Sequence, residues 1–149
     1  MSTIEVEVTH HFKASPESVI DAWLDPDKVR AWFSIALQRL GLAGEVAQIE
    51  IDPKVGGAFL FSDMRDGVET RHWGTYLELE RPRRIVFTWN TVESDESDPI
   101  KIVLTIEPEG EGCVAKLVNE MDSKWADNVP QTTEGWSRIL EATEALLDE

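Results

Sequence analysis

The chain has 149 residues, of which 42% are hydrophobic, and this size and composition are typical of one globular domain that covers residues 1–149. Fourteen lysines and arginines against 29 aspartates and glutamates give a formal net charge of −15, so most of the surface would repel nucleic acids and anionic membranes. The single cysteine, Cys113, excludes an internal disulfide framework and a cysteine-rich zinc site. We therefore predict a cytoplasmic protein that binds no nucleic acid.

The hydrophobic pattern of the sequence predicts neither a membrane-spanning segment nor a targeting signal. No apolar run approaches the roughly 18 residues that a transmembrane helix needs. Residues 1–5 lack the basic and then apolar pattern of a secretion signal. We expect no membrane span and no cleaved leader.

The N-terminal part of the chain predicts one strand followed by two helices. Apolar and polar residues alternate over 3–13, which is the period of a half-buried strand. The serine, proline and glutamate at 15–17 suit the free amides at a helix start and predict a short helix through Trp23. After the prolyl turn at 25–27, apolar residues recur at helical spacing, which predicts a second helix that ends at Gly41.

The middle of the chain predicts six further strands. Short alternating runs between turn residues cover 45–52, 57–63, 68–80, 84–92, 100–108 and 113–122. Most separators are too short for a crossover helix, so neighbouring strands should pair antiparallel. The acidic separator 93–98 has no apolar residue. We interpret it as an exposed hairpin loop rather than a calcium loop, because it lacks the central glycine and terminal glutamate of an EF-hand.

The C-terminal segment predicts a long amphipathic helix. Between Val129 and Leu147, apolar residues follow a 3.6-residue period and charged residues fall largely between them. A seven-stranded antiparallel sheet needs cover on one face, and this helix must supply most of it. We therefore predict an α+β fold in which the sheet curls around the C-terminal helix, while the two short helices between the first and second strands form the rim of a small-molecule cavity.

Several segments, taken in order, resemble one protein family. They are residues 19–26 with Trp32, residues 52–57, Asp66-Gly67, residues 74–79, residues 84–89 and Gly135-Trp136. This ordered set covers nearly the whole chain and is similar to the proteins related to the C-terminal domain of the activator of heat-shock protein 90 ATPase. The resemblance implies the helix-grip fold of the START-related, birch-pollen-allergen-like (SRPBCC) superfamily, whose members enclose a hydrophobic cavity. That fold hosts carriers, enzymes and co-chaperone modules, so function has to be argued from the site.

The sequence departs from the family pattern at two places. Residues 33–44 form an apolar and helical stretch where members often have a short proline-containing linker, and this would reshape the cavity mouth. Asn119 stands at the end of the last strand, where a histidine is common. Any role that depends on that histidine does not carry over to this chain.

Six tryptophans in a chain of this length predict an aromatic cavity. Buried indole rings either fill a core or line a pocket, and their N–H groups need partners. As a set, the six favour a pocket for an apolar or aromatic ligand. The residues that we expect to line it are His10, Phe12, Trp32, Phe33, Leu37, Phe59, Phe61, Trp73, Phe87, Trp89, Asn119, Met121, Trp136 and Leu140.

Candidates for catalysis or metal binding are few. His10 is in phase with the apolar face of the first strand, so it either forms a hydrogen bond in the core, which we favour, or acts as an acid or base. His11 points to the opposite face, and we expect His72 to lie away from the cavity. Three histidines without ligands at metal spacing predict no metal, and no motif predicts a cofactor. Acidic neighbours disfavour the Cys113 thiolate, so we predict an inert thiol.

Two further motifs have structural explanations. Gly56-Gly57 lies between two strands rather than before a helix, so it predicts a tight turn or bulge rather than a phosphate site. Arg81, Arg83 and Arg84 flank a proline, and we interpret them as a solvated turn. The alternative for these arginines is a small anion or an acidic partner.

Three functions remain, and we rank them. The first is a binding module for an apolar or aromatic small molecule. The second is a protein-interaction module like the co-chaperone domain, for which a chaperone partner is not favoured. The third is a cavity enzyme of the cyclase or hydrolase type with His10 as acid or base; it would need convergent polar groups, for which Asp63, Tyr76 and Asn119 are the other candidates. We expect any assembly to be a symmetric homodimer with a contact through 33–44.

Overall fold

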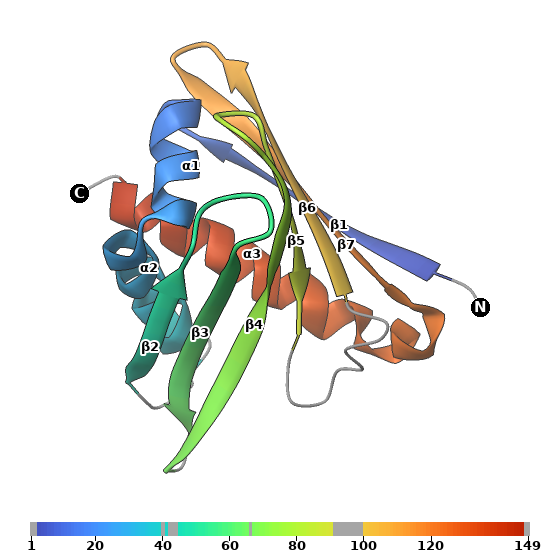
Figure 1. The fold of residues 1–149 in the computed structure, drawn as a ribbon. Helices are drawn as coiled ribbons and strands as arrows, with labels where there is room; N and C mark the ends of the chain where they lie inside the picture. Colours follow the sequence, from blue (N-terminus) through green and yellow to red (C-terminus); the bar gives the residue numbers. More distant parts are fainter. Residues whose placement is uncertain (1–2, 40, 42–44, 66, 91–99, 148–149) are drawn as a thin grey trace.

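A seven-stranded antiparallel sheet with the order β1-β7-β6-β5-β4-β3-β2 curls around one long helix (Figure 1). This computed structural model describes residues 3–39, 41, 45–65, 67–90 and 100–147. Its elements are β1 (Thr3–Phe12), α1 (Pro16–Leu24), α2 (Pro26–Arg39), β2 (Val46–Ile51), β3 (Ala58–Arg65), β4 (Val68–Glu80), β5 (Arg84–Trp89), β6 (Ile100–Glu109), β7 (Gly112–Asp122), the 3₁₀ helix η1 (Ser123–Asn128) and α3 (Val129–Leu147).

The predicted helix-grip architecture is confirmed. The seven strands and three α-helices lie where the periodicity placed them, and their ends differ by only a few residues. The short helix η1 was not predicted, because six residues carry too little periodicity. The acidic run 93–98 lies outside the described residues.

The helix α3 lies across the concave face of the sheet, and α1 and α2 cover the remaining part of that face beside it (Figure 1). The helix α2 contacts both α3 and β2, so it bridges the central helix and one edge of the sheet. This arrangement leaves the space between α2, α3 and the middle strands as the interior of the domain.

Strand alternation places the core on this concave face. On β6, Ile102, Leu104 and Ile106 are fully buried, while the residues between them are less so. Leu140 of α3 is 0% exposed. The paired register of β6 with β7 sets Leu104 beside Leu117, which continues the apolar layer across the sheet.

The helix starts and turns follow the expected chemistry. The Ser15 hydroxyl oxygen accepts a hydrogen bond from the Ser18 amide and caps α1, with Pro16 at the first helical position. Gly56 has φ +85°, and a Cβ atom at Gly57 would lie 2.1 Å from the Asp52 carbonyl oxygen. These two glycines therefore form a tight turn with close backbone approach.

Two of the three arginines around the turn after β4, Arg81 and Arg84, pair with carboxylates of the same chain. Arg81 Nη1 lies 3.4 Å from Asp21 Oδ1, and Arg84 Nε lies 3.3 Å from Glu78 Oε1. All four side chains are at least one-third exposed, so these pairs contribute little to stability.

The apolar side chains of the second helix face inward. Phe33, Ala36 and Leu37 are all buried. The exposed apolar face that we expected on 33–44 is therefore not found on 33–39, because these residues pack against the interior; residues 40 and 42–44 lie outside the described part. Within the described chain, none of the helices combines the length and apolar character that crossing a membrane requires.

Candidate functional site

Most of the large aromatic side chains form one packed cluster inside the sheet. The ring centroids of Trp23 and Trp136 lie 6.5 Å apart in a stacked arrangement, and Trp89 meets Trp136 edge-on at 5.1 Å. The void within this aromatic cluster is about 20 Å³, which is room for roughly one water molecule. The residues around the void are Trp23, Trp32, Phe33, Phe59, Phe61, Tyr76, Ile85, Phe87, Trp89, Trp136 and Ile139.

A larger cavity of about 260 Å³ adjoins the aromatic cluster. We call it the mouth cavity. Phe33, Trp89, Trp136 and Ile139 line both spaces, so the cluster forms one wall of the mouth cavity. Its lining residues come from α2, α3 and five strands: Phe33, Ala36, Leu37, Arg65, His72, Trp89, Ile100, Asn119, Met121, Thr132, Gly135, Trp136 and Ile139.

The amide of Asn119 has a fixed orientation at this cavity. The indole Nε1 of Trp136 donates a hydrogen bond of 2.9 Å to Asn119 Oδ1. An indole N–H can only donate, so the amide oxygen must face Trp136 and the Asn119 Nδ2 group must face away from it. Asn119 is 2% exposed, and its Nδ2 has no hydrogen-bond partner among the described residues.

His72 lies on the same cavity with its ring flat against an indole. The imidazole stacks on Trp89 with centroids 5.1 Å apart and planes 12° apart. Burial, together with the nearby Arg65 charge, lowers the pKa of His72 to about 4, although the Asp63 charge opposes this. The imidazole is therefore neutral at pH 7, and its buried Nδ1 has no partner within the part of the chain that the structure describes.

The expectation that His72 lies away from the cavity is wrong. His72 pairs with Phe61 in the register of β3 and β4, and it is in phase with Gly74 and Tyr76 on the buried side of β4. The alternation of 68–80 carried this signal, since residues two apart on a strand share a face.

An ion pair lies at the outer part of β3. Arg65 Nε donates to Asp63 Oδ2 at 2.7 Å and Arg65 Nη2 to Asp63 Oδ1 at 3.3 Å. Asp63 is 1% exposed, so its carboxylate depends on this partner. Arg65 lines the mouth cavity, but its charge is already compensated.

The residues that we expected to line a cavity fall into three groups. Those around the aromatic cluster are Trp32, Phe33, Phe59, Phe61, Phe87, Trp89 and Trp136. Those on the mouth cavity are Phe33, Leu37, Trp89, Asn119, Met121 and Trp136. Those that line neither space are His10, Phe12, Trp73 and Leu140.

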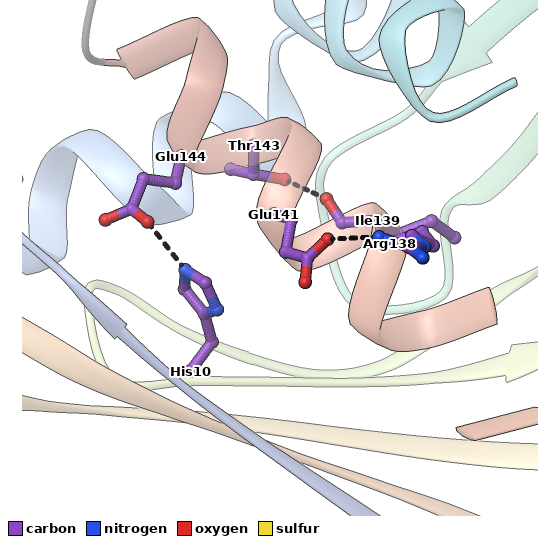
Figure 2. Close-up of polar contacts among 6 residues, drawn as sticks. All are labelled: His10, Arg138, Ile139, Glu141, Thr143 and Glu144. Carbon is purple, nitrogen blue, oxygen red and sulfur yellow. Dashed lines mark hydrogen bonds and ion pairs between the residues drawn. The ribbon is translucent and has the colours of Figure 1, made fainter. Parts of the chain in front are cut away.

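His10 instead connects β1 to the last turns of α3, as Figure 2 shows. Its Nε2 lies 2.9 Å from Glu144 Oε1 and donates to it, since an ionised carboxylate can only accept. His10 is four residues from Val6, which pairs with Asn119. Four strand residues correspond to roughly 13 Å. The imidazole is therefore remote from the polar groups of the mouth cavity.

Sequence reasoning missed Gly135 as a cavity residue. This glycine lies inside α3, where glycine costs roughly 0.5–1 kcal/mol relative to alanine. Apart from its chain neighbours and the backbone of its own helix, no described atom lies within 4 Å of the position that its Cβ would take. A helix-interior glycine without a steric need is a signal that could have indicated the open space beside it.

The other candidates for chemistry are poorly placed. Cys113 is buried, and burial, with smaller contributions from Glu17 and Glu109, raises its thiol pKa. A thiol with a raised pKa is a weak nucleophile at neutral pH. Among the described residues, no three histidine, cysteine or carboxylate side chains are grouped as a metal site requires.

Comparisons with known proteins identify the family. Residues 13–148 match the family described as activator of Hsp90 ATPase homolog 1-like protein. The chain belongs to this family. Similar solved structures include CV1439 from Chromobacterium violaceum, with 25% identity, 97% of each chain covered and a TM-score of 0.76. An AHSA1-like protein from Aeromonas hydrophila has 20% identity, with 97% of this chain and 92% of that chain covered and a TM-score of 0.79. No curated protein matches the chain.

The family assignment agrees with the resemblance found in the sequence. It supports a ligand-binding helix-grip domain in general. The mouth cavity has room for a molecule, and its lining includes Asn119 and His72, whose buried Nδ2 and Nδ1 have no partner among the described residues.

Proposed function

We propose that this domain binds a small, mainly apolar or aromatic molecule in the mouth cavity. The observation that carries the proposal is the open space of about 260 Å³ with largely apolar walls. A cavity of roughly 150 Å³ lined by apolar side chains can hold a benzene ring. The mouth cavity is therefore suited to a ligand of about two fused rings.

The aromatic cluster supports this choice of location. Its void of about 20 Å³ is too small for a ligand, so the cluster acts as a rigid wall rather than a pocket. Trp89 and Trp136 belong to both spaces. A ligand in the mouth cavity would contact their indole rings, and intrinsic fluorescence would report its binding.

The proposal is tested by titrating the protein with tetralin, a neutral bicyclic hydrocarbon, while tryptophan fluorescence is recorded. We expect saturable quenching. Gly135 lines the mouth cavity, and a Cβ atom added there meets no neighbour, so the ring of the variant Gly135→Phe should fill the cavity and abolish the quenching.

The matched control is Gln131→Phe, which adds the same ring at an exposed position of the same helix. It should bind tetralin like the wild type. Quenching that does not saturate in the wild type, or that is identical in both variants, would refute binding in this cavity.

A further inference from the structure

We infer that Gly135 determines which apolar molecules the mouth cavity accepts, because its missing side chain leaves a notch in α3 that receives one ring of the ligand. We call the space beside α3 at Gly135, between Thr132 and Ile139, the Gly135 notch. This inference rests on the proposed function and names the residue that limits the size of the ligand.

The first step is that Gly135 differs from the other glycines of the described residues. Each of the others has either a positive φ angle or a backbone carbonyl oxygen 1.9 or 2.1 Å from the position of an added Cβ atom. Either condition disfavours a larger residue. Gly135 has neither, and its Cβ position has no described atom within 4 Å apart from chain neighbours and the backbone of its own helix. The local structure therefore does not require a glycine here, although glycine is unfavourable inside a helix.

The second step is the place of Gly135 on the cavity wall. The residues of α3 that line the mouth cavity are Thr132, Gly135, Trp136 and Ile139. Their spacing of three or four residues places them on one face of the helix. Gly135 lies between Thr132 and Ile139 on this face, and these two residues are separated by roughly 10 Å along the helix axis. The missing side chain therefore leaves open space between two side chains of the cavity wall.

The third step is that an apolar ring can occupy the Gly135 notch without a polar cost. Amide and carbonyl groups in the interior of an α-helix are hydrogen bonded within the helix. A ring that covers the backbone at Gly135 therefore leaves no polar group without a partner. Trp89 and Trp136 line the same cavity, so the second ring of a bicyclic ligand can lie against their indole rings.

The consequence is a limit on ligand size that depends on one residue. A side chain at position 135 would occupy the space that the first ring needs, and added methyl groups in a filled site are unfavourable. A ligand with two rings should therefore lose affinity when position 135 carries a side chain. A ligand with one ring can use the remainder of the cavity and should keep its affinity.

The test measures the dissociation constants of tetralin and benzene for the wild type, Gly135→Ala and Gly135→Val, from backbone amide resonances during titration. We expect tetralin to bind at least about fivefold more weakly to Gly135→Ala, and more weakly still to Gly135→Val, while benzene affinity stays within about twofold. Loss of structure would weaken both probes together, so the ratio of the two dissociation constants separates the notch from a structural effect. If Gly135→Val does not fold, Gly135→Ala still decides.

The matched controls are Gln131→Ala and Gln131→Val, which carry the same side chains at an exposed position of the same helix. Both should bind tetralin and benzene like the wild type. In the wild type, nuclear Overhauser effects between the Hα atoms of Gly135 and the protons of bound tetralin should place the ring in the notch directly.

The outcomes separate the two proposals. If neither probe binds saturably to the wild type, the proposed function fails, and this inference fails with it. If tetralin binds equally to the wild type and the Gly135 variants, if both probes lose affinity by the same factor, or if bound tetralin shows no Overhauser effect with Gly135, this inference is overturned and the proposed function stands.

Discussion

Two indole rings fix the orientations of two polar side chains at the mouth cavity. Trp136 fixes the amide of Asn119 through a hydrogen bond, and Trp89 fixes the imidazole of His72 through stacking. Both indoles also belong to the packed aromatic cluster, so their positions are set by the core. The polar groups are therefore held in place without a ligand, which would reduce the ordering cost of the proposed binding.

The lowered pKa of His72 predicts a pH dependence of stability. The ordinary value is 6.5, whereas burial lowers the pKa in the folded protein to about 4. Between these values the unfolded chain binds a proton that the folded protein does not. Stability due to this group is therefore present above about pH 6.5 and is lost as the pH falls toward 4. The full effect is at most roughly 3 kcal/mol.

The measurement is urea unfolding of the wild type and of His72→Phe at several pH values between 7 and 4. Both proteins contain the same carboxylates, so general acid destabilisation cancels in the comparison. The wild type should lose more stability than the variant over this range. Parallel curves for the two proteins would show that His72 titrates normally.

At the scale of elements, α3 is the central support of the fold. Its inward side carries Trp136, Leu140 and Thr143, all of which are buried. The same helix provides Thr132, Gly135 and Ile139 to the mouth cavity. The helix α3 therefore contributes side chains both to the core and to the lining of the mouth cavity.

Replacing Leu140 by alanine should destabilise the protein by about 2–5 kcal/mol, because a fully buried side chain would leave a cavity between the helix and the sheet. The control is Gln131→Ala on the exposed side of the same helix, where we expect a change within about 0.5 kcal/mol. Chemical denaturation measures both. Equal effects in the two variants would contradict the gripped position of α3.

Replacing Gly135 by alanine should stabilise the ligand-free protein by about 0.5–1 kcal/mol, since the helix gains a better former and the new methyl group meets no neighbour. Gly74→Ala is the contrasting change. A Cβ atom at Gly74 would lie 1.9 Å from the Thr88 carbonyl oxygen, so this variant must displace β5 and lose stability. The unfolding temperature should rise for Gly135→Ala and fall for Gly74→Ala. A lower unfolding temperature for Gly135→Ala would show that the space beside α3 is already filled.

At the scale of the whole molecule, periodicity predicted the elements and their order, but not which part of the interior stays open. Trp89 was expected to line a cavity as one of six tryptophans, and Asn119 because it stands where the family often has a histidine. The division into a filled aromatic cluster and an open mouth cavity depends on the distance between α2, α3 and the sheet, which no local pattern contains. His72 was misplaced although its phase with Gly74 and Tyr76 on β4 was readable from the alternation of the strand.

The net charge of the whole molecule makes a final prediction. The formal net charge is −15, and the folded chain holds its carboxylates close together. Their mutual repulsion is weaker in the expanded unfolded chain. The ion pairs of the surface are mostly exposed and individually weak, so they do not offset this term. Raising the ionic strength from about 0.01 M to about 0.1 M shortens the screening length from about 30 Å to about 10 Å. Thermal unfolding at pH 7 should therefore move to higher temperature as sodium chloride is added, and choline chloride should act equally because screening does not depend on the cation. A fall in the unfolding temperature, or an effect specific to sodium, would show that attractive ion pairs or a bound cation dominate the electrostatics of this domain.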